Sequence, residues 1–258
     1  MKSKRLAFLS IALLAVLGLT ACMPSSQNNS QQNPGQESHS SESIEKILKK
    51  AESANQAVSS MKLKVDLSIT VDGSTKHQTM DGSLLYDKQS KELDKGALIL
   101  RETADGQQSY QEMIMSGGQD MPVYSRDSEK GTWSKELTEG TARYFVRPDY
   151  FRLLEGLYSM ADDVSMKESG SDYVFTLKSK NTDIIGLFGD EFSLELSGVA
   201  QSEMDKTLEV HLNKETLYLS DFKMDLSYSG EKGSLKTKIA NRFSDWNKLA
   251  DDAITAPD

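Results

Sequence analysis

The chain has 258 residues, 27% of them charged, and a formal net charge of −9 at pH 7. Such an acidic surface repels phosphate backbones, so we expect no nucleic acid among its partners. Cys22 is the only cysteine, which excludes a disulfide within the chain and a zinc site built from several thiolates.

The first 21 residues have the features of an export signal. Lys2, Lys4 and Arg5 make the start basic, and an apolar run from Leu6 to Leu19 follows. This run is too short to span a bilayer comfortably, and small residues come after it. We therefore expect residues 1–21 to be a signal peptide. Its removal takes away positive charge and leaves the rest of the chain more acidic.

The stretch Leu19, Thr20, Ala21 and Cys22 resembles the lipobox of bacterial lipoproteins. That resemblance implies cleavage before Cys22 and a diacylglyceryl group on its sulfur. Two acyl chains hold a protein stably on a bilayer, whereas one holds it only marginally. We expect a lipid anchor on the extracytoplasmic face of the cell membrane, on a Gram-positive surface. The alternative is an ordinary secretory signal with an incidental cysteine.

Residues 22–42 form a polar segment rich in serine, glutamine and asparagine, with His39 within it. Such a composition cannot bury enough apolar surface to offset the entropy of ordering, so we expect a disordered tether. Its roughly 20 residues span on the order of 25 Å. Residues 43–258 then form a single domain.

The domain begins with a predicted helix and continues as an antiparallel sheet. Ser43 suits an N-cap, and apolar residues recur at helical spacing from Ile44 to Met61. From Leu63 to Val71 every second residue is apolar, which is typical of a strand with one buried face. Asp72-Gly73 predicts a hairpin turn. Further strands are predicted around residues 80–86, 97–100, 110–115 and 121–124, with a loop at 125–132.

The middle of the chain changes from strand to helix and back. Pro148 suits the first turn of a helix whose apolar residues extend to Ala161, and Tyr173 to Leu177 returns to strand alternation. Residues 183–199 are ambiguous: we expect a helix in the first half, and the pattern leaves residues 190–199 open between helix and strand.

The last third predicts three more strands, around residues 208–212, 217–228 and 235–243. The apolar positions shift from odd to even numbers near Ser220-Asp221. A β-bulge there would keep the same face buried. A local exit from the sheet is the other explanation.

The order of these elements is similar to the LolA/LppX/LprG-like group of envelope lipoproteins and its Gram-positive branch. The resemblance rests on the lipobox, the polar tether, the helix near Ile44, the long strand Met61–Val71 and the stretch Val123–Trp133. It implies an α+β fold, a strongly curved antiparallel β half-barrel with helices covering the concave face and an apolar cavity between them. Members with known roles carry lipids or lipid-linked molecules.

The sequence contains no catalytic signature. A Gly-x-Ser-x-Gly elbow, a phosphate-binding glycine loop and a His-Glu-x-x-His helix are all absent. His211 alternates with apolar neighbours in its strand and should face water, and His77 lies near a predicted turn. The pairs Asp162-Asp163, Asp190-Glu191 and Asp251-Asp252 lack the spacing of a calcium loop. We therefore expect no enzyme activity, no metal and no cofactor.

The leading hypothesis is a monomeric lipoprotein that holds a hydrophobic or lipid-like ligand in an apolar cavity. The residues proposed for the cavity wall are Phe145, Phe151, Leu154, Tyr158, Ile184 and Phe188. The alternative is a protein–protein interaction or envelope-sensing module with a filled core. A continuous apolar cavity of at least roughly 300 Å³ would favour the carrier, and a core packed to normal density would favour the interaction module.

Overall fold

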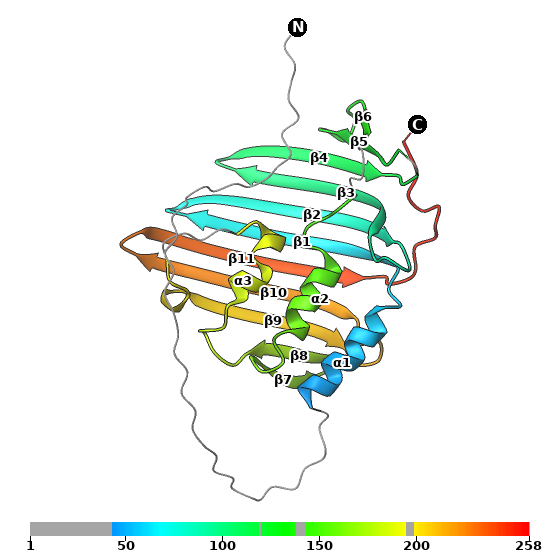
Figure 1. Cartoon of the computed structure of the whole chain (residues 1–258). Helices are drawn as coiled ribbons and strands as arrows, with labels where there is room; N and C mark the ends of the chain where they lie inside the picture. The colour runs from blue at the N-terminus through cyan, green and yellow to red at the C-terminus, as the bar shows by residue number, and fades with distance from the viewer. Residues whose placement is uncertain (1–42, 119, 138–142, 195–198, 258) are drawn as a thin grey trace, which may run out of the picture.

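The computed structural model describes residues 43–257 except for 119, 138–142 and 195–198. Within this part the chain forms one curved, unclosed antiparallel sheet with helices covering its concave face (Figure 1). The α+β half-barrel expected from the sequence is therefore confirmed. We call the helix-covered side of the sheet the inner face and the opposite side the outer face.

The sheet has eleven described strands in the order β6-β5-β4-β3-β2-β1-β11-β10-β9-β8-β7. Their bounds are β1 (Ser60–Val71), β2 (Ser74–Tyr86), β3 (Leu93–Ala104), β4 (Gln107–Met115), β5 (Pro122–Arg126), β6 (Ser134–Leu137), β7 (Val164–Ser169), β8 (Asp172–Leu177), β9 (Asp205–Asn213), β10 (Leu219–Gly230) and β11 (Gly233–Ser244). The chain runs outward from β1 to one edge, crosses to the other edge and returns to pair β11 with β1. Leu63 thereby lies opposite Phe243.

Among the described residues, three α-helices cover part of the inner face: α1 (Ile44–Asn55), α2 (Tyr150–Tyr158) and α3 (Ile184–Phe188). Ser43 caps α1 by accepting a hydrogen bond from the backbone of Lys46, as predicted. In the described part of the chain, none of the helices is long and apolar enough to cross a membrane.

The start and end of α2 differ from the prediction. Asp149 is its N-cap and accepts two backbone N–H groups, so Pro148 precedes the helix instead of occupying its first turn. The reason is that a carboxylate satisfies free N–H groups at a helix start, which proline cannot do. The helix also ends at Tyr158 and not at Ala161, because the chain must turn there to reach β7.

The ambiguous stretch is helical at its start. It contains α3 and then a 3-10 helix, η1 (Asp190–Phe192), which excludes a strand at those residues. Ser193 has a positive φ of 51° and ends η1. Residues 195–198 lie outside the described part, and a second 3-10 helix, η2 (Gln201–Glu203), precedes β9.

The predicted β-bulge is present in β10. The pairing of β10 with β9 shifts register between Leu219 and Asp221. Leu219 and Phe222 are both fully buried on the inner face, although their numbers differ in parity. The extra residue thus restores the burial face, and the alternative of a local exit from the sheet is wrong.

The core fills the space between the inner face and the helices. The Phe188 ring of α3 contacts Phe222 edge-on with centroids 5.0 Å apart, and Tyr150 of α2 contacts Phe243 in the same way. Buried Asn55 of α1 accepts a hydrogen bond from the Tyr150 hydroxyl at 2.6 Å. The core cluster runs in sequence from Ile47 to Phe243. We therefore expect residues 43–258 to fold without the preceding segment.

Candidate functional site

The inner face has a helix-covered half and a half without helices. Figure 1 shows α1, α2 and α3 in front of β1 and β7 to β11, and no described helix in front of β3 to β6. The difference follows from topology, since α2 and α3 belong to the segments that enter and leave the β7–β8 edge.

The strand register places one continuous row of side chains across both halves. Phe222 lies opposite Asn241, Asn241 opposite Val65, Val65 opposite Met80, and Met80 opposite Leu100. Directly paired residues of antiparallel strands share a face, so these five side chains all belong to the inner face. The row leads from the rings under α3 to strands that no described helix covers.

The inner face of β2 to β5 carries an apolar group that we call the methionine strip. It consists of Met80, Leu98, Leu100, Met113, Met115 and Val123. Leu100, Met113 and Val123 are only partly buried. Methionine is unbranched and adapts to irregular apolar partners. The strip is therefore an apolar surface that can change shape against a ligand.

Two polar features bound this strip. At one end the Tyr144 hydroxyl donates to the Pro122 carbonyl at 2.7 Å, and Tyr144 also bridges to Leu93. At the other end Lys76 Nζ and Glu102 Oε2 form an ion pair at 2.8 Å. Between them Met80, Leu98 and Met115 are buried, and the partly exposed side chains of the strip are Leu100, Met113 and Val123.

The six residues proposed for a cavity wall do not lie together on a free surface. Leu154, Ile184 and Phe188 are buried in the packed core. Phe151 is partly buried, with its ring 5.1 Å from that of Tyr86, and the Tyr158 hydroxyl accepts a hydrogen bond from Asn55. Phe145, in contrast, is 71% exposed, with its ring against the Arg147 guanidinium. Its apolar character in the sequence did not show that it lies outside the core.

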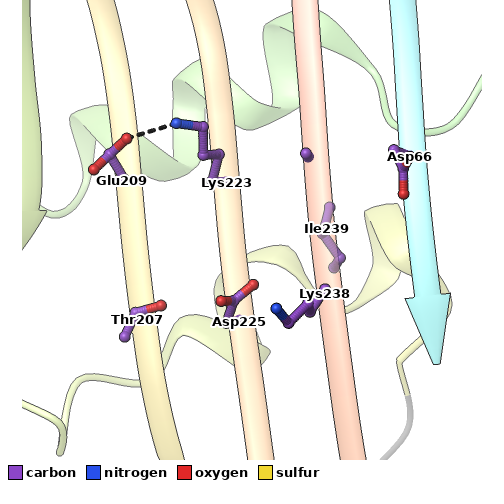
Figure 2. A pocket seen from close by; sticks show the side chains of 8 residues that line it. Asp66, Thr207, Glu209, Lys223, Asp225, Lys238 and Ile239 are labelled. Carbon is purple, nitrogen blue, oxygen red and sulfur yellow. Dashed lines mark hydrogen bonds and ion pairs between the residues drawn. The ribbon is translucent and has the colours of Figure 1, made fainter. Parts of the chain in front are cut away.

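Two hollows of the described chain lie elsewhere. One of about 70 Å³ lies beside Ser60 and Lys95. The larger, about 410 Å³, opens on the outer face of β1, β9, β10 and β11 (Figure 2). Its lining side chains are mostly polar or charged: Asp66, Thr207, Glu209, Lys223, Asp225, Lys238, Ile239 and Ala240. Neither is an apolar cavity between the sheet and the helices.

The outer face carries paired charges. Lys223 Nζ donates to Glu209 Oε1 at 2.8 Å, and hydrogen bonds from Lys223 and His211 lower the pKa of the Glu209 carboxyl. His211 also lies 3.4 Å from Asp172, and His77 pairs with an aspartate on β1. Both imidazoles thus bond to carboxylates, not to the hydroxyl of a serine nucleophile. Within the described residues, no three His, Cys, Asp or Glu side chains gather as a metal site requires.

Sequence reasoning predicted the strands of the methionine strip but missed the strip as a site. Alternation marks Met80, Met113 and Met115 as facing one side, and it does not show whether a helix covers that side. The signal available in the sequence was the number of methionines at inner-face positions of the predicted sheet. The lipobox, Cys22 and the tether lie outside the described residues.

The family model "Family of unknown function (DUF6612)" matches residues 43–258. No curated protein matches the chain. Among solved structures, LprF from Mycobacterium bovis is similar at 9% identity and a TM-score of 0.43, covering 80% of this chain and 94% of LprF. MucB in complex with MucA(peri) is similar at 12% identity and a TM-score of 0.28, and the match covers 83% of this chain and 60% of the MucB chain. A DUF1329 family protein from Desulfovibrio piger is similar at 8% identity and a TM-score of 0.26, and the match covers 81% of this chain and 94% of that protein. Similarity at this level transfers no function to the chain.

Proposed function

The chain belongs to the family of unknown function DUF6612, and we propose that it is a non-catalytic lipoprotein that binds an apolar or lipid-like ligand against the inner face of its sheet. The observation that carries this proposal is the methionine strip on β2 to β5. It is continuous with the core, contains partly exposed apolar side chains and lies where no described helix covers the sheet.

Physical chemistry favours a ligand on this surface. Removing apolar surface from water contributes roughly 25 cal/mol per Å². Leu100, Met113 and Val123 keep part of their apolar surface exposed, and a ligand lying on them would remove that surface from water. The deformable Met113 and Met115 side chains suit hydrocarbon chains of variable shape. The apolar part of the ligand would therefore lie beside α2 on the strip, and not in a closed cavity beneath α2 and α3.

The proposed anchor explains how such a domain would meet its ligand. A diacylglyceryl group on Cys22 would hold the chain on the extracytoplasmic face of the cell membrane, and the polar segment 22–42 would act as the tether. Cys22→Ser is expected to abolish lipid labelling and to release the protein from the membrane fraction. Ser25→Ala is the matched control, because it changes a neighbouring residue without removing the thiol. Membrane-bound, acylated Cys22→Ser protein would contradict the anchor.

Native mass spectrometry tests the binding proposal. Residues 43–258, purified from the original host without detergent extraction, are expected to carry an extractable apolar molecule. Met113→Glu places a charge on the strip and should remove it, whereas Ile114→Glu changes the next residue, which faces the outer side. If the wild-type domain carries no such molecule and binds no added lipid, the proposal is wrong.

The second candidate is a protein–protein interaction or envelope-sensing module. The specific observation in its favour is the filled interior: the rings of Phe188 and Phe192 pack on Phe222 beneath α3. The charged hollow on the outer face would then be part of a partner surface. This candidate predicts lipid-free protein in the same mass spectra, together with loss of partner binding when Lys223 and Lys238 are replaced.

A further inference from the structure

Asn241 of β11 is a buried polar residue without a described partner. It is 2% exposed, and neither its Oδ1 nor its Nδ2 has a hydrogen-bond partner among the described residues. Its neighbours across the strands, Val65 and Phe222, are both apolar. Burying an amide without partners is unfavourable, and buried polar groups in proteins are almost always paired. The Oδ1 atom can therefore still accept hydrogen bonds, and the Nδ2 amide group can still donate them.

The position of Asn241 relates it to the proposed ligand site. On one side Phe222 is covered by the rings of Phe188 and Phe192. On the other side Val65 and Met80 continue the same row into the methionine strip. Asn241, on β11, thus lies within the helix-covered half, and Val65 of β1 separates it from Met80 of the methionine strip (Figure 1). A molecule lying along the strip would reach this amide by inserting its polar end past Val65 and beneath the helices, once the adjacent side chains shift.

We propose that Asn241 binds the uncharged polar head of an amphiphile whose hydrocarbon chain lies along the methionine strip. This inference rests on the proposed function and specifies the ligand class. A hydroxyl or carboxamide head fits, because each can accept from Nδ2–H and donate to Oδ1. An ionised head does not fit, because the groups flanking Asn241 offer no counter-charge and an unpaired buried charge is very unfavourable.

Two lysines of the inner face already have partners. Lys76 pairs with Glu102, and Lys206 Nζ donates to the Thr182 carbonyl and to Gln201 Oε1, each at 2.8 Å. None of these groups lies in the row that contains Asn241. The polar group that this row offers to a ligand is therefore the neutral amide of Asn241.

The test uses the delipidated domain, residues 43–258, and three probes with hydrocarbon chains of fourteen carbons. These are 1-monomyristoylglycerol, tetradecane and myristate at pH 8, each measured by displacement of the neutral fluorophore N-phenyl-1-naphthylamine. Asn241→Leu should weaken monomyristoylglycerol binding about tenfold, the loss expected for one buried hydrogen-bonding group. Tetradecane binding should stay within about twofold, since the alkane makes no hydrogen bond. Wild-type protein should prefer monomyristoylglycerol to myristate.

Two further variants keep the result interpretable. Thr237→Val removes another buried and unpartnered polar atom of β11, in a different row, and should change none of the three affinities. Asn241→Ala should reproduce the loss if the leucine variant does not fold. Unchanged monomyristoylglycerol binding in a folded Asn241 variant, or a preference for myristate, overturns the inference and leaves the proposed function standing. If wild-type protein binds none of the three probes, the proposed function itself fails.

Discussion

Gly156 of α2 lies directly against the Phe188 ring of α3. A Cβ atom at position 156 would lie 2.8 Å from the Phe188 Cζ, a distance at which one of the two must move. The Phe188 ring is fully buried and packs on Phe222, so it has little room to move. The contact between the two helices therefore depends on the absence of a side chain at position 156.

The magnitude follows from two opposing effects. Overpacking a buried site costs about 2 kcal/mol, whereas replacing glycine by alanine inside a helix stabilises by about 1 kcal/mol. Gly156→Ala should therefore lower the free energy of unfolding by about 1 kcal/mol. In a Phe188→Ala background the clash is gone, and the same substitution should raise the free energy of unfolding by about 1 kcal/mol. The expected coupling between the two positions is about 2 kcal/mol.

Urea denaturation followed by far-ultraviolet circular dichroism measures all four proteins of this cycle. Phe188→Ala alone should cost about 4 kcal/mol, since it empties a fully buried aromatic site. If Gly156→Ala stabilises the wild-type chain by the full helix-propensity gain, the helices do not approach each other as described and the reasoning is refuted.

Three further predictions concern other parts of the domain. Asn55→Ala should lower the free energy of unfolding by about 3 kcal/mol, because it leaves the buried Tyr150 hydroxyl without its acceptor. Urea titration measures this loss, with Tyr150→Phe as the control. A loss below about 1 kcal/mol would contradict the prediction. Burial, reinforced by the nearby Asp149 carboxylate, raises the pKa of Glu191. The folded chain then binds the Glu191 proton more tightly than the unfolded chain does. The resulting stabilisation is complete below the ordinary glutamate pKa and is lost as pH rises through the raised pKa. Lowering the pH from neutral towards 5 should thus stabilise wild type relative to Glu191→Gln; a difference in unfolding free energy that does not depend on pH would count against this. Phe145→Ser should change the unfolding free energy by less than about 0.5 kcal/mol, since the ring is exposed, and a loss above about 2 kcal/mol would place Phe145 in the core.

Local signals in the sequence predicted much of the sheet. Strict alternation from Leu63 to Val71 identified β1, and the change of parity at Ser220-Asp221 identified the bulge in β10. Strand β7 was not predicted. It is an edge strand in which only Val164 is buried, so its sequence carries almost no periodic apolar signal. Its conformation depends on pairing with β8.

The candidate site was less predictable, because it depends on which surfaces the tertiary structure covers. Phe145 and Phe188 are equally apolar in the sequence, yet one is exposed and the other is fully buried. Asn241 alternates with apolar residues, but only the register across β10, β11 and β1 shows that apolar side chains flank it.

The sequence by itself determined the period of β1, the cap of α1 and the position of the bulge in β10, because these depend on residues close together in the chain. It also determined the predictions that lie outside the described residues, the lipobox and the lipid on Cys22. Only the tertiary structure decided that β11 pairs with β1, that the helices cover one half of the inner face and that the methionine strip is left without one. Burial depends on contacts between segments far apart in sequence, and local periodicity does not encode their arrangement.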